Sequence, residues 1–156
     1  MTDNTPTVEP QDQAAAETPP SDQVRALDRL IGRWTITGGS RGTVTYEWME
    51  GGYFLLQRVE LEYDGQRASG LEVIGNLRPY GQAPSAEVHS RFYDSGGNTF
   101  DYVYELADDT LRIWAGERGS PAYFSAPFPQ GATEVTGEWV FPGGGGYTST
   151  MTRSDP

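Results

Sequence analysis

Short segments of alternating apolar and polar residues constrain the fold of this chain most. From Arg33 onward, glycine and proline interrupt the sequence at intervals of about 8–12 residues, a spacing typical of all-β sandwiches and barrels. The segments between these breaks are rich in the β-branched and aromatic residues that strands favour. No gap is long enough for a crossover helix, so we predict an all-β fold, an antiparallel up-and-down barrel of about ten strands. The expected strands are 33–38, 42–50, 53–63, 66–77, 85–94, 98–107, 110–116, 121–128, 132–141 and 147–153.

A short amphipathic helix is expected over 21–31, immediately before the first strand. Ser21 is a suitable N-cap, and Gly32 would end the helix. A helix this short is unstable alone, so its apolar face must pack against the barrel. We therefore expect it to close one end of the barrel, next to Trp34. The apolar positions on its face are Val24, Leu27, Leu30 and Ile31.

Composition divides the chain and excludes several functions. Residues 1–20 are acidic, rich in proline and poor in large apolar side chains, so a disordered tail is expected before one domain over 21–156.

The chain has no cysteine, and 22 acids against 11 bases give a formal charge of −11. Every base is an arginine, and the arginines are scattered, which argues against nucleic-acid and anionic-membrane partners. We find no secretory signal, so a cytoplasmic location is the expectation.

Hairpin turns fix which residues face each other, and these registers predict the inner face. A two-residue turn at 108–109 pairs Tyr104 with Ile113, and a three-residue turn at 95–97 pairs Val88 with Tyr104. The two hairpins therefore agree that Tyr104 faces inward. With the turn at 51–52 and the last hairpin, the inner positions expected to bind a ligand are Tyr46, Trp48, Gln57, Ser90, Phe92, Phe100, Tyr102, Tyr104 and Trp139.

These inner positions are mostly aromatic, with a few hydrogen-bonding groups. Such a lining suits a small hydrophobic ligand, aromatic or acyl, that is held by few polar contacts. Side chains can fill an eight-stranded barrel, whereas ten strands leave more room, so a cavity is expected.

The orientation of Glu72 has two interpretations. Continuing the register of a tight turn at 64–65 places Glu72 inside, opposite Gln57, where its pKa would be raised and it could act as an acid or base. A β-bulge at Gly70 would instead turn Glu72 outward and bury Leu71 and Val73. The bulge is favoured because it avoids desolvating a carboxylate.

Four sequence motifs in order carry a resemblance to a known group of proteins. They are Gly32-x-Trp34, the segment 47–55 (EWMEGGYFL), the segment 70–75 (GLEVIG) and the segment 92–97 (FYDSGG). Over about 24–153 the chain resembles a bacterial family of lipocalin-like proteins of unknown function, within the calycin superfamily of lipocalins, fatty-acid-binding proteins and nitrobindin. The resemblance implies that Trp34 plugs the barrel floor and that Arg153 packs across its ring.

His89 is the only histidine, and nitrobindin relatives bind haem through a histidine. The register places His89 on the outer face, and the longer glycine-rich signature and late histidine of those relatives are absent, which argues against haem. A single histidine with scattered carboxylates also has no metal-ligand spacing, so we expect neither a metal nor a cofactor. His89, Val103 and Trp114 form an outward row that should be covered, either by the helix at 21–31 or by a second subunit. Because the helix is expected to close the barrel floor, we expect a homodimer contact through Val103 and Trp114.

Three functions agree with these observations. An outward Glu72 with an open cavity would favour binding of a small hydrophobic molecule. An inward Glu72 with an open cavity would favour an isomerase, cyclase or hydrolase that moves a proton with this carboxylate and tyrosines. A filled lumen would favour a protein-interaction module.

Overall fold

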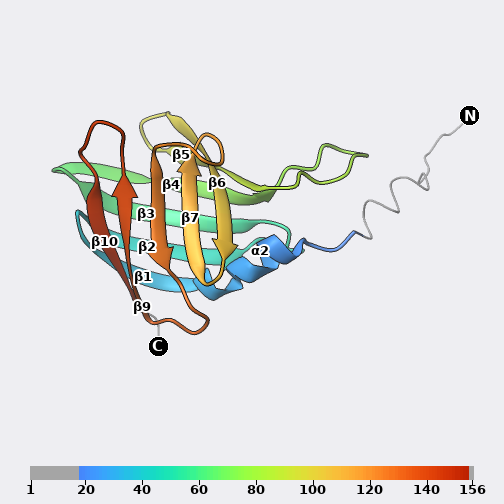
Figure 1. The fold of residues 1–156 in the computed structure, drawn as a ribbon, viewed down its shortest axis with the longest axis horizontal. Coiled ribbons are helices and arrows are strands. Elements are labelled where there is room, and N and C mark those ends of the chain that lie inside the picture. Colours follow the sequence, from blue (N-terminus) through green and yellow to red (C-terminus); the bar gives the residue numbers. More distant parts are fainter. Residues whose placement is uncertain (1–17, 155–156) are drawn as a thin grey trace, which may run out of the picture.

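The ten predicted strands form a closed antiparallel barrel in a computed structural model, which describes residues 18–154 (Figure 1). Each strand pairs with its neighbours in sequence, and β1 pairs with β10 to close the barrel. The strands are β1 (Gly32–Gly38), β2 (Ser40–Trp48), β3 (Leu55–Tyr63), β4 (Gln66–Asn76), β5 (Val88–Asp94), β6 (Thr99–Ala107), β7 (Thr110–Ala115), β8 (Tyr123–Pro127), β9 (Glu134–Val140) and β10 (Tyr147–Arg153). The all-β fold and the strand order are therefore confirmed.

The predicted hairpin registers are also confirmed. Tyr104 pairs with Ile113 across one hairpin and with Val88 across the other. Asp108 and Asp109 both adopt positive φ angles, of 52° and 58°, as a two-residue turn between twisted strands requires. Alternate residues of every strand therefore point into the barrel, as expected.

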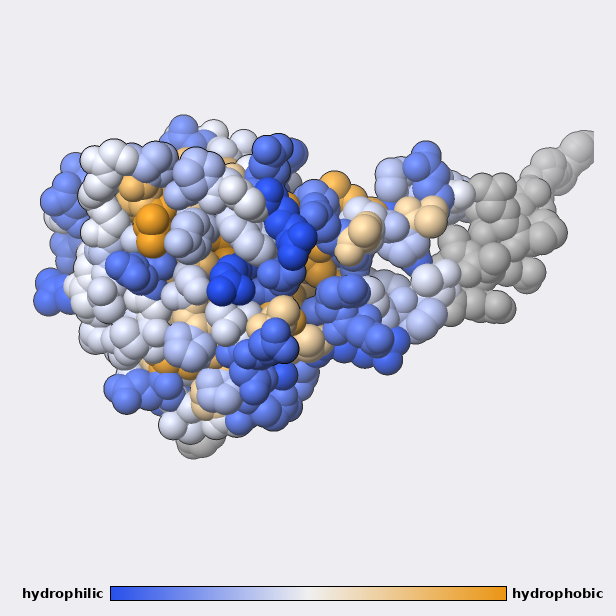
Figure 2. Space-filling view, in the orientation of Figure 1, coloured by the Kyte–Doolittle hydropathy of each residue, from blue (hydrophilic) through white to orange (hydrophobic). Residues whose placement is uncertain are grey.

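The outer face is mostly polar. Figure 2 shows hydrophilic residues over much of the visible face, with apolar residues in small separate areas. Arginines lie beside acids of neighbouring strands, as in the pair Arg91 and Asp101, whose Nε and Oδ1 atoms are 2.6 Å apart. Exposed ion pairs of this kind contribute about 1 kcal/mol or less each, so they favour solubility and register more than stability.

Val103 and Trp114 lie on the outer face, as predicted, but their cover comes from the single chain and not from a second subunit. Val103 is 1% exposed and Trp114 is 9% exposed within the single chain. The guanidinium of Arg118, from the loop after β7, lies 5.5 Å from the centre of a Trp114 ring and covers it. The reason for expecting a dimer at this pair is therefore lost, and the dimer itself stays an untested prediction.

A short helical segment closes one end of the barrel. It consists of helix α2 (Asp22–Ala26) and the 3₁₀ helix η1 (Leu27–Leu30). The predicted single helix therefore changes from α to 3₁₀ geometry after Ala26, and it ends before Ile31. The Ser21 side chain accepts a hydrogen bond from the backbone N–H of Val24, which confirms the N-cap. The buried side chains on its inner face are Val24, Leu27 and Leu30.

Trp34 lies at the centre of this closed end and is fully buried. Its indole N–H donates to the carbonyl of Leu30 at 2.8 Å. The guanidinium of Arg153 lies 4.2 Å from the centre of the Trp34 ring and donates to the carbonyls of Ile31 and Arg29. The Trp34 and Arg153 contact implied by the resemblance is thus present.

Other strands also hold the helical segment. The indole N–H of Trp48 donates to Asp28 at 2.8 Å, and the Ser21 hydroxyl donates to Asn76 at 2.7 Å. Ahead of it, in the described part of the predicted tail, the carbonyl of Pro20 accepts from Arg25. Residues 1–17, which make up most of that tail, lie outside the described residues. Between residues 18 and 154 we find no helix that is long and apolar enough to span a bilayer.

We predict that Arg153→Met lowers the free energy of unfolding by about 2–4 kcal/mol, because it removes charge-assisted hydrogen bonds to two carbonyls and a cation–π contact. Urea unfolding followed by tryptophan fluorescence measures the change. The matched control is Arg58→Met, since Arg58 is exposed and forms a long 3.8 Å pair with Glu47. A loss no greater than that of the control would contradict the structural role of Arg153.

Candidate functional site

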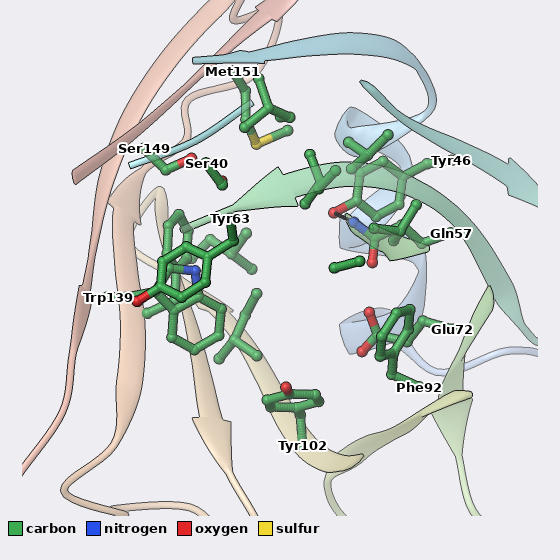
Figure 3. A pocket seen from close by; sticks show the side chains of 18 of the residues that line it. Ser40, Tyr46, Gln57, Tyr63, Glu72, Phe92, Tyr102, Trp139, Ser149 and Met151 are labelled. Atoms are coloured by element: carbon green, nitrogen blue, oxygen red, sulfur yellow. Dashed lines mark hydrogen bonds between the residues drawn. The ribbon is translucent and has the colours of Figure 1, made fainter. Parts of the chain in front are cut away.

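The barrel encloses a cavity of about 300 Å³ above the closed end (Figure 3). Its lining includes Ser40, Tyr63 and Tyr147, which stand at the strand ends far from the helical segment. Tyr63 is 40% exposed, so the cavity opens to solvent at this end, which we call the mouth. The remaining lining is largely aliphatic and aromatic.

Six of the nine predicted ligand-binding residues line this cavity. They come from β2, β3, β5, β6 and β9, and they were placed by hairpin registers that the structure retains. The six are Tyr46, Gln57, Phe92, Tyr102, Tyr104 and Trp139.

The other three lie elsewhere. Trp48 lies at the closed end, where its indole N–H donates a hydrogen bond to Asp28. Phe100 stands near the mouth, where it is 44% exposed and stacks on Phe92 at 6.2 Å between ring centres. Ser90 is buried beside the cavity and donates to Glu72 instead of lining the space.

Several lining residues were missed as site candidates. Tyr63 follows the inward Leu61 by two residues, so the strand period could have identified it. Phe124 lies on β8, for which no turn had fixed a register, and its ring packs 5.3 Å from that of Trp139. The others include Ile36, Ser40, Tyr147 and Met151.

Glu72 faces the cavity, so the favoured bulge at Gly70 is wrong. Pairing between β3 and β4 runs without interruption from Leu61 and Ala68 through Gln57 and Glu72. Gly70 is required for a different reason. A Cβ atom there would lie 2.1 Å from the carbonyl oxygen of Tyr93 and 2.9 Å from the Phe92 ring. The glycine therefore allows the Phe92 ring to lie close against β4 and keeps Glu72 in register.

The Glu72 carboxyl group is buried and hydrogen-bonded. It is 5% exposed and accepts from the Ser90 hydroxyl at 2.5 Å and from the Tyr104 hydroxyl at 3.1 Å. Burial raises the pKa of Glu72 from its ordinary 4.5 to about 7, although both hydrogen bonds act in the opposite direction. This carboxyl group can therefore give or take a proton near neutral pH.

Tyrosines and one amide surround this carboxyl group. The Gln57 amide donates to the Tyr46 hydroxyl at 2.8 Å, and both residues lie on the same wall as Glu72 in Figure 3. Burial raises the pKa of Tyr102 to about 12, with a further contribution from the negative charge of Glu72. The pKa of Tyr46 and that of Tyr104 are raised by the same two causes. All three phenols are thus neutral hydrogen-bonding groups at physiological pH.

The arrangement allows proton transfer or binding but offers no nucleophile activated by histidine. His89 pairs with Val103 on the outer face, away from the cavity. Among residues 18–154, we find no group of three or more histidine, aspartate or glutamate side chains placed to hold a metal ion. The chemistry of the cavity therefore depends on Glu72, the tyrosines and the apolar walls.

No protein-family model matches this chain, and no curated protein matches its sequence significantly. The resemblance to lipocalin-like proteins thus stays a prediction, although the barrel agrees with it in fold.

The raised pKa of Glu72 predicts how stability depends on pH. The folded chain holds the Glu72 proton more tightly than the unfolded chain, so the contribution of Glu72 to stability falls as pH rises from 4.5 to about 7. Glutamine does not ionise. The stability of Glu72→Gln relative to the unchanged protein should therefore increase by about 3 kcal/mol across this window.

Urea unfolding of both proteins at about pH 5 and about pH 8 measures this difference. Glu138→Gln is the matched control, because it removes an exposed carboxylate from the outer face of β9. A difference between Glu72→Gln and the unchanged protein that stays the same at both pH values would contradict the raised pKa.

Proposed function

We propose that this protein binds a small, mostly apolar molecule inside its barrel. The observation that carries the proposal is the cavity of about 300 Å³, whose aromatic and aliphatic walls enclose a small set of polar groups. Ligand sites in proteins have this composition, and their volumes begin at about 300 Å³.

The closed end and the mouth support a pocket with one entrance. Trp34, Arg153 and the helical segment occupy one end, while Tyr63 and Tyr147 border the other. The tyrosine rings at the mouth lie 4.8 Å apart between centres and continue the apolar wall outward. An interaction module with a filled barrel is less well supported, because the lumen holds a cavity. Membership of the lipocalin-like family and a cytoplasmic location stay predictions.

An inward Glu72 in an open cavity is the arrangement expected of an enzyme that transfers a proton, and we propose this as the second candidate, because the cavity supports binding whether or not a proton moves. This carboxyl group lines the cavity, and its pKa of about 7 suits a general acid or base at neutral pH. Tyr102, whose neutral hydroxyl also lines the cavity, could donate a hydrogen bond to an oxygen that gains negative charge during the reaction. An isomerase, cyclase or hydrolase of a small hydrophobic substrate would use the same cavity.

The binding function predicts that filling the cavity abolishes ligand binding. Ala68 lines the cavity, so Ala68→Trp should weaken binding of the uncharged probe N-phenylnaphthylamine by about tenfold or more, because the indole occupies the ligand's place. Fluorescence titration measures the affinity. Arg67→Trp places the same side chain one position away on the outer face and should bind like the unchanged protein. Equal loss in both variants, or no binding by the unchanged protein, would contradict lumen binding.

The enzyme candidate predicts proton exchange on a bound carbon acid. Acetylnaphthalene is an uncharged aryl ketone that should fit the same walls, and its methyl protons exchange slowly in deuterated buffer. Proton NMR should show exchange accelerated by about 10²–10⁴-fold in the presence of the protein, and Glu72→Gln should remove the acceleration. If the ketone binds but exchange is not accelerated, the barrel binds without proton transfer to carbon.

A further inference from the structure

We propose that the cavity selects a small aromatic amine, whose ammonium group pairs with Glu72 while its ring lies among the aromatic walls. This inference rests on the proposed binding function and specifies the chemistry of the ligand. It also narrows the expected class, because a fatty acid or another carboxylate would not suit the same site.

The charges of the cavity favour a cation. Among the lining residues of the described chain, Glu72 carries the only carboxylate, and none is an arginine or a histidine. An anionic ligand would find no positive partner and would be repelled by Glu72. An uncharged ligand would leave the ionised carboxylate without a counter-charge in an apolar surrounding. An ammonium group supplies that counter-charge.

The hydrogen bonds of Glu72 leave room for a ligand donor. A carboxylate offers about four lone-pair positions on its two oxygens. Ser90 donates to one oxygen and Tyr104 to the other, so about half of this capacity is used within the chain. An ammonium group brings three N–H donors and can occupy the remaining positions through charge-assisted hydrogen bonds.

Aromatic rings surround the path from Glu72 across the cavity. Phe92 pairs with Glu72 in the β4–β5 register, and both residues lie on one wall in Figure 3, with Trp139 and Tyr63 across the open space. The Trp139 ring centre lies 6.2 Å from that of Tyr102. Ring faces attract a cation and also stack on an aromatic body, so the walls suit both parts of such a ligand.

The net charge of the whole molecule also favours a cationic ligand. A formal charge of −11 attracts cations toward the protein and repels anions, and the attraction weakens as salt concentration rises. Entry at the mouth therefore also favours an amine over a carboxylate of the same size.

Three probes with the same ring system test the inference. Naphthylmethylamine is a cation, naphthylmethanol is neutral and naphthoate is an anion at about pH 8. Calorimetric titration of the full chain should show that the amine binds about tenfold or more tightly than the alcohol, since close charge pairs contribute at least this much. Naphthoate should bind more weakly than the alcohol.

Two variants test whether the preference for the amine over the alcohol depends on Glu72. Glu72→Gln should remove the preference for the amine, so that this variant binds the amine and the alcohol with about equal affinity. Glu138→Gln removes the same formal charge from the outer face and should keep the preference for the amine. The retained binding of naphthylmethanol by Glu72→Gln also shows that this variant is folded.

A pH series on the unchanged protein gives a second readout. The ammonium of naphthylmethylamine stays charged below about pH 8, as that of lysine does. Affinity for the amine should therefore fall several-fold between about pH 8 and about pH 6 as Glu72 takes up a proton, while affinity for the alcohol stays constant. Tyr46, Tyr102 and Tyr104 also face this region, but their raised pKa values keep them neutral throughout. The facing side chains that do not titrate are Gln57, Ser90 and Phe92.

The outcomes separate this inference from the binding function. Equal affinity for the amine and the alcohol would overturn the inference and leave lumen binding in place. A preference for the amine that survives Glu72→Gln would also overturn it, because the selectivity would then come from another group. Failure of all three probes to bind would overturn both proposals.

Discussion

The contact of Arg153 with Trp34 is the interaction on which this barrel most depends. It joins the end of the last strand to the start of the first, where the sheet closes on itself. The same guanidinium group donates to two carbonyls at the end of the helical segment, including that of Arg29. Strand closure and the plug of the barrel thus share one cation, so the cavity above it has a fixed floor.

Most of the fold could be predicted from the sequence because local turns fix the registers. Asp108 and Asp109 form a two-residue turn, and once that turn is known, alternation along both strands assigns each side chain to a face. Six cavity residues follow from this logic. Phe100 was wrongly predicted to line the cavity. It has the inward phase, but it lies near the mouth and is exposed, and a register does not tell how far along the barrel the cavity extends.

The orientation of Glu72 could not be predicted, because a glycine in a strand has two meanings. Gly70 would suit a bulge, but it would equally suit the close approach of another chain segment. The Phe92 ring and the Tyr93 carbonyl decide between these, and both belong to a strand about twenty residues later. The cover over Trp114 was missed for a similar reason, since Arg118 reaches it from a loop that no register describes.

The closed floor has a consequence for kinetics. In a pocket with one entrance, a ligand with a polar head must enter head first if that head is to reach Glu72, and it must leave along the same path. The head of such a ligand would shed its water while the ring was still passing Tyr63 and Tyr147, which line the cavity at its mouth. Association would then be limited by desolvation of the head, and residence time by the release of the ring from the aromatic mouth.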